Sequence, residues 1–156
     1  MKKALPIMII WLTLFSLQAF AHCQVPCGIF DDGLRFSIMN EHAETVLKAM
    51  NQIKELSAAE KPDLNQIIRW TNTKDAHAND IIDICSNYFL CQRIKPATGD
   101  QNEATVKAYL AKLEKIHQLM ISAMKCKHHT DTAEVERLKT LIHEFLHLYD
   151  EKAHKH

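Results

Sequence analysis

The sequence predicts an all-α protein whose helices pack as an antiparallel four-helix bundle. Two observations lead to this fold class. Only three glycines and four prolines occur in 156 residues, which argues against a turn-rich β fold and for long, uninterrupted helices. Apolar residues also recur at intervals of three and four along four separate segments, and this spacing is typical of amphipathic helices.

The first stripe lies between Phe36 and Leu56, and Pro62 marks its end. A second helix is predicted from about Leu64 to Cys91, where the period continues. The apolar positions of the first stripe are Met39, Ala43, Val46, Leu47, Met50 and Ile53. Those of the second are Ile67, Ile68, Thr71, Ala78, Ile81, Ile82, Cys85, Tyr88 and Phe89.

Residues 95–100 contain a proline and a glycine and are predicted to form a loop. The third helix follows, and the fourth starts at Asp131, where Glu134 completes a pattern like a capping box. The third stripe is Val106, Leu110, Leu113, Ile116, Leu119, Met120 and Ala123. The fourth is Val135, Leu138, Leu141, Ile142, Phe145 and Tyr149. Four helices of similar length with short connections should pack antiparallel.

Composition limits the partners. The chain is 47% hydrophobic and 24% charged, with a formal net charge of zero, which is typical of one soluble domain. It has no basic run and no interleaving of aromatic with basic residues. The sequence therefore predicts no nucleic-acid partner and no anionic lipid surface.

The first 21 residues read as a signal peptide, separate from a domain over 22–156. Two lysines precede an apolar stretch over 4–15, and residues 19–21 show the small-x-small pattern read by signal peptidase. The stretch is too short to span a bilayer. We therefore expect cleavage after Ala21, an exported protein that is periplasmic or secreted, and no membrane contact after cleavage.

Cleavage at this point would leave His22 with a free α-amino group, followed by Cys23. The amine, the Cys23 peptide nitrogen and the Cys23 sulfur can close two five-membered rings around a metal ion. Cys27 lies four residues on, with Pro26 restricting the turn and Gly28 free to take positive φ, so its thiolate can complete a plane. Two nitrogens and two sulfurs in a square favour nickel(II) or copper(II) over zinc. The bundle is thus predicted to carry an N-terminal metal-binding hook.

The stretch HCQVPCGIFDD resembles the N-terminal hook of nickel superoxide dismutases, with the pattern H-C-x-x-P-C-G-x-Y-D. The resemblance continues through residues 69–78 and 86–89 and covers essentially the whole mature chain. It implies a four-helix bundle that assembles as a homohexamer, with one nickel per chain held by His22, Cys23 and Cys27. It also implies that superoxide is converted to oxygen and hydrogen peroxide as nickel alternates between Ni(II) and Ni(III).

The chain departs from the family pattern at several positions. Phe30 replaces a tyrosine that holds water or anions near the metal, and Tyr88, which matches the family's second such tyrosine, is the catalytic candidate alongside His22. The family also tethers the histidine ring through a glutamate and an arginine. Glu41 is the nearest counterpart of the glutamate, and Lys74 lies near the position of the arginine.

Three alternatives stay open at this point. His143, Glu144 and His147 match H-E-x-x-H of zinc peptidases, but few residues follow to supply a third ligand, so solvent-facing histidines are the simpler interpretation. The chain could also be an exported nickel carrier or sensor without turnover. Of the remaining thiols, Cys85, Cys91 and Cys126, an odd number, two could form a disulfide and leave one buried.

Overall fold

The computed structural model describes residues 24–99 and 102–150. The predicted signal peptide and two of the predicted nickel ligands, His22 and Cys23, lie outside these residues. The described helices are α2 (Asp32–Ala58), α3 (Leu64–Asp83), the π-helix η1 (Ile84–Arg93), α4 (Glu103–His128) and α5 (Thr132–Asp150).

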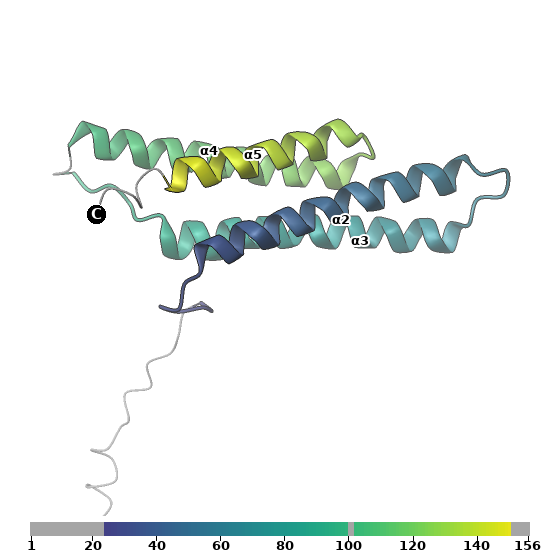
Figure 1. The fold of residues 1–156 in the computed structure, drawn as a ribbon, viewed down its shortest axis with the longest axis horizontal. Helices are drawn as coiled ribbons and strands as arrows, with labels where there is room; N and C mark the ends of the chain where they lie inside the picture. The colour runs from purple at the N-terminus through teal and green to yellow at the C-terminus, as the bar shows by residue number, and fades with distance from the viewer. Residues whose placement is uncertain (1–23, 100–101, 151–156) are drawn as a thin grey trace, which may run out of the picture.

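The helices run alternately up and down, so each is antiparallel to its neighbour in the chain (Figure 1). α2 packs against α3 and α5, and α4 packs against α5 and α3, which closes a four-membered bundle. The predicted all-α bundle is confirmed. The α2–α3 hairpin extends past α4 and α5 at one end (Figure 1), whereas residues 24–31 leave the bundle at the start of α2. None of the described helices is both long enough and apolar enough to cross a membrane.

Short polar side chains begin each of the four α-helices because they satisfy backbone N–H groups that lack a partner in the first turn. Asp31 accepts from Leu34 N at 2.9 Å, and Asp63 accepts from Gln66 N at 3.1 Å. Asn102 does the same at α4. At α5 the predicted start is confirmed, although the Asp131 carboxylate accepts from Ala133 N, at 3.0 Å, and not from Glu134.

The second predicted helix is confirmed in its extent and in its buried residues Cys85, Tyr88 and Phe89, but its last third is not α-helical. The α-helical hydrogen bonds end at Asp83, and the chain continues as a π-helix to Arg93. Ile94 N donates to Phe89 O at 2.8 Å, a bond five residues back. The wider turn shifts the angle between successive side chains, and it brings the consecutive residues Tyr88 and Phe89 both into the core. A π-helix of this kind breaks the 3.6-residue period on which the prediction rested.

An aromatic cluster closes the core at the end of the bundle near the hook. Phe36 of α2 packs on Phe89 and Phe145 with ring centroids 5.0 and 5.3 Å apart, and Tyr149 of α5 adds a fourth ring. Phe89 and Phe145 are fully buried. Removing one such ring typically costs about 3–5 kcal/mol, so this cluster fixes the platform on which the N-terminal segment sits.

Lys74 is a buried lysine, 2% exposed, that joins α3 to the far connection of the bundle. Its Nζ donates to the carbonyl oxygens of Cys126 and Lys127 at 2.8 and 2.5 Å, and to Asp75 at 2.8 Å. The two carbonyls belong to the last turn of α4, where backbone oxygens lack partners and a cation is favoured. Lys74 therefore caps α4.

Candidate metal centre

Residues 24–30 form a bent segment just before α2, and they include one of the predicted nickel ligands. Cys27 is exposed and is a free thiol. The Val25–Pro26 peptide bond is cis, and Gly28 has φ +79°, as the sequence predicts. No atom lies within 4 Å of where a Cβ on Gly28 would stand, so conformation rather than space requires glycine here. The local chain thus presents the Cys27 sulfur at the outer side of a turn.

The bent segment rests against the junction of α3 with η1. A cavity of about 180 Å³ lies there, lined by Val25, Pro26, Arg35 of α2, Asp83, Ile84, Asn87 and Tyr88. Tyr88 is 3% exposed, and the Arg35 guanidinium lies 5.0 Å from the centre of its ring. The structure therefore places Tyr88 in the same cavity as Val25 and Pro26, with the Arg35 cation beside its ring.

An ion pair ties the base of the hook to the bundle. Asp32, in the first turn of α2, accepts from Arg93 Nε at 2.8 Å and from Arg93 Nη2 at 2.6 Å. The Tyr88 hydroxyl donates to the same carboxylate at 2.5 Å. The side chains of Asp32 and Arg93 are 23% and 30% exposed, so solvent screens the pair only in part. These contacts join the start of α2 to both halves of η1.

The network shifts the proton affinity of its members. Burial alone would raise the pKa of Asp32, but the hydrogen bonds from Arg93 and Tyr88 outweigh it and hold that pKa below its usual value. Burial, and then the hydrogen bond to Asp32, raises the pKa of Tyr88 to about 12. The hydrogen bond to Asp32 also raises the pKa of Arg93. Near neutral pH the network consists of a carboxylate, a neutral phenol and a guanidinium.

Phe30 takes part in this network through its ring. The guanidinium carbon of Arg93 lies 4.5 Å from the ring centre, and the ring meets Tyr88 edge-on with centroids 5.8 Å apart. Phe30 therefore packs where the family pattern has a tyrosine, and a cation covers its face.

The donor chemistry fits nickel, because an exposed unpaired thiol on a turn supplies the soft sulfur that nickel accepts together with nitrogen ligands. Residues 17–153 match the family described as nickel-containing superoxide dismutase. The chain belongs to the nickel-containing superoxide dismutases. It is thus an oxidoreductase with a nickel cofactor that acts on superoxide. No match was found among curated proteins or among solved structures.

Two of the residues that the family resemblance suggested as partners of the histidine ring lie elsewhere among the described residues. Lys74 is occupied at the end of α4, so it cannot serve in place of the family's arginine. Glu41 is exposed on α2 and does not line the cavity beside the hook. Its predicted contact with His22 involves a residue outside the described part of the chain, and this contact stays a prediction.

Sequence reasoning missed Asp32, Arg35 and Arg93. Asp32 resembles an ordinary residue of a helix first turn, and Arg93 an ordinary residue of a helix last turn. Their pairing depends on η1, whose π-helical turns the sequence did not reveal. The one usable signal was that two acidic residues, Asp31 and Asp32, follow the hook, although a single cap needs only one.

The remaining cysteines of this nickel superoxide dismutase do not pair. Cys85 and Cys126 are buried free thiols and Cys91 is an exposed one, so the interpretation of one disulfide among them is wrong. Burial raises the pKa of Cys85 to about 12 and that of Cys126 to about 11, so both thiols stay protonated near neutral pH. Neither buried thiol is suited to metal binding.

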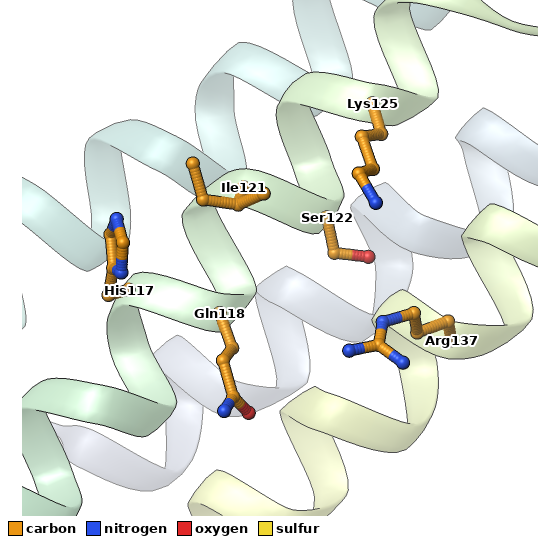
Figure 2. Close-up of a pocket in the computed structure, with 6 residues that line it drawn as sticks. All are labelled: His117, Gln118, Ile121, Ser122, Lys125 and Arg137. Carbon is orange, nitrogen blue, oxygen red and sulfur yellow. The ribbon is translucent and has the colours of Figure 1, made fainter.

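Two further places on the described surface contain histidine but lack the ligands of a nickel centre. Nε2 of His143 and Nε2 of His147 lie 3.1 Å apart on α5, but Glu144 is paired with Lys115 at 2.7 Å. A cavity of about 230 Å³ between α4 and α5 is lined by His117, Gln118, Ile121, Ser122, Lys125 and Arg137 (Figure 2). It holds no thiol and one imidazole. Neither place combines sulfur with nitrogen, as the hook does.

Proposed function

We propose that this enzyme is an exported nickel superoxide dismutase, and that removal of residues 1–21 creates its metal site. The new α-amine of His22, the Cys23 peptide nitrogen, the sulfurs of Cys23 and Cys27 and the His22 imidazole would hold the nickel. One nickel binds per chain. The observation that carries the proposal is the exposed, unpaired Cys27 on a turn held against the bundle.

The chain's own residues prepare the site for an anionic substrate. Bound nickel supplies one-electron redox chemistry, through its divalent and trivalent states, for the conversion of two superoxide ions and two protons to oxygen and hydrogen peroxide. Arg35 contributes positive charge beside the hook, and its Nε is buried without a hydrogen-bond partner in the described structure. A cation at this position attracts superoxide.

Tyr88 is proposed to act at the same site as a neutral group. Because its pKa is about 12, its phenol stays protonated near neutral pH and donates a hydrogen bond to Asp32. It therefore orients the substrate side of the hook and excludes water there, while protons for peroxide come from solvent. His22 is the second proposed catalytic residue, and its imidazole would be one of the nickel ligands.

Export and assembly complete the proposal. Superoxide crosses apolar layers poorly because it is charged, so a periplasmic or secreted dismutase would protect targets outside the cytoplasm. Leu64 and Ile68 are 68% and 60% exposed and lie four residues apart on α3, at the end where the α2–α3 hairpin extends. Such a surface supports contact between copies, as in a homohexamer.

A nickel carrier or sensor would use the same hook without turnover. It predicts one bound nickel and no consumption of superoxide. The positive charge of Arg35 beside the hook favours the dismutase, because a carrier has no need to attract an anion.

Nickel content and superoxide consumption, measured on protein purified after natural processing, test the proposal. The wild type should hold one nickel per chain and remove superoxide, and Cys27→Ser should lose both. Cys91→Ser is the matched control, because it removes another exposed free thiol that does not line the cavity beside the hook and should leave both intact. Bound nickel without superoxide removal would establish the carrier, and full activity in Cys27→Ser would overturn the ligand set.

A further inference from the structure

A second cluster of metal-binding side chains lies on the seam between α2 and α3. His42 comes from α2, and His77 and Asp80 come from α3. The two Nδ1 atoms are 2.7 Å apart, and Asp80 Oδ2 lies 3.7 Å from His42 Nδ1. One ligand atom from each residue lies within 4.8 Å of the other two. The two histidines lie 35 residues apart in the sequence, so nothing local in the sequence shows that they meet.

The helical hairpin explains why these residues meet. His77 and Asp80 are three apart, so they share one face of α3. α2 runs antiparallel to α3, and His42 lies about as far before the hairpin connection as His77 lies after it. Three side chains from two helices thus point to a common spot on a rigid scaffold, which is the setting in which ligand positions are well defined.

We propose that His42, His77 and Asp80 bind a divalent cation of the zinc class, with solvent in the fourth position. Two imidazole nitrogens and a carboxylate oxygen are ligands that zinc takes at about 2.0–2.2 Å. Tetrahedral ligands at that distance are about 3.3 Å from each other. The observed separations of 2.7 and 3.7 Å fall on either side of this value, so small rotations of the side chains suffice.

Partial burial and charge support the site. The side chain of His42 is 18% exposed, so water competes weakly for its nitrogen, whereas Asp80 is 51% exposed and leaves a path for an ion to enter. Glu41 adds a second negative charge close to His42.

The site is distinct from the hook in place and in chemistry. His42 lies ten residues after Asp32 in α2, which corresponds to about 15 Å along the helix. The site of His42, His77 and Asp80 contains no sulfur, so it favours zinc, whereas the hook favours nickel. A cation held there would join α2 to α3 and stabilise the hairpin rather than react with superoxide.

The competing explanation is a hydrogen bond between two neutral imidazoles, which 2.7 Å also satisfies. The His143–His147 pair provides the matched comparison. It places two imidazole nitrogens 3.1 Å apart, and no third ligand completes a group around it among the described residues. If tight zinc binding requires three protein ligands, only the α2–α3 cluster should bind zinc tightly.

The test uses the naturally processed, nickel-loaded protein titrated with Zn²⁺, with bound zinc measured by elemental analysis. Wild type and His143→Gln should hold one zinc per chain in addition to nickel, with a raised thermal midpoint. His77→Gln should weaken zinc binding by at least about tenfold and lose the thermal shift while it keeps nickel and dismutase activity. Asp80→Asn, at a half-exposed side chain, should also weaken zinc binding, and it serves if His77→Gln does not fold.

Absence of zinc beyond nickel in the wild type, or equal zinc in His77→Gln and Asp80→Asn, would overturn the proposal and leave the imidazole hydrogen bond. Loss in His143→Gln equal to that in His77→Gln would also overturn it, because it would point to unspecific surface binding. Cys27→Ser separates this inference from the function of the hook. That variant should lose nickel but still hold one zinc, so the zinc site and the nickel site can each be refuted independently of the other.

Discussion

Replacing Asp32 with asparagine tests whether the network at the base of the hook holds the N-terminal segment in place. Asp32 accepts two hydrogen bonds from Arg93 and one from Tyr88. Asparagine keeps one acceptor oxygen but sets an amide donor against Arg93 Nη2, so one charge-assisted bond, of about 1.5–3 kcal/mol, is lost. The hydrogen bond from the Tyr88 hydroxyl then joins two neutral groups, which costs about 1 kcal/mol more. A neutral amide is easier to bury than a carboxylate, and this offsets about 1 kcal/mol of the lost stability. The expected destabilisation is about 2 kcal/mol.

Two assays follow this change. Thermal unfolding of metal-free protein should show a lower midpoint in Asp32→Asn, and nickel competition against a chelator should show weaker binding because the hook loses its anchor. Glu60→Gln is the control, since Glu60 is exposed in the connection between α2 and α3 and also loses one negative charge. A variant that melts and binds nickel like the control would refute the idea that Asp32 positions the hook.

Three further predictions follow from the same structure. Lys74→Met should lower the free energy of unfolding by about 2–4 kcal/mol in denaturant titrations, because it leaves two α4 carbonyls without their donor, whereas the exposed Lys125→Met should change it little. The pKa of Asp32 in the folded protein lies below its ordinary value of 3.8. The stability that this carboxylate contributes is therefore fully present above pH 3.8 and is lost as the pH falls through the folded-state pKa. Melting midpoints between pH 6 and 3 should fall less in Asp32→Asn than in wild type. Tyr88→Phe should cost about 1 kcal/mol and slow superoxide removal without lowering nickel content, and unchanged kinetics would exclude a role for the phenol.

The fold was predictable because the apolar period is regular in three of the four helices. Glycine and proline are so few that the breaks fall at only a few places, and Asp31, Asp63 and Asn102 cap the helices as such residues do elsewhere. The sequence did not reveal that the end of the second predicted helix, η1, is a π-helix. A π-helix depends on tertiary packing around Tyr88 and Phe89, and no local pattern in the sequence specifies it.

The sequence proposes ligands for the candidate site but does not reveal what supports them. A histidine and a cysteine directly after the predicted cleavage signal, with Cys27 four residues on, are candidate donors because they lie close together along the chain. The partners of such a hook come from distant segments, and Arg93 reaches Asp32 across 61 residues. The same holds for the His42–His77 contact, which joins residues 35 apart through the register of two helices. Single-sequence periodicity does not fix that register.

The central claim is that the processed amino terminus itself is a ligand. Its most direct test compares two forms of the purified chain, one beginning at His22 and one that keeps Ala21 in front of it, for nickel retention and for the spin signal of trivalent nickel after oxidation. The chain that begins at His22 should retain one nickel and give the signal with a nitrogen axial ligand, and the extended chain should lose both. Equal retention and identical spectra in the two forms would contradict the claim.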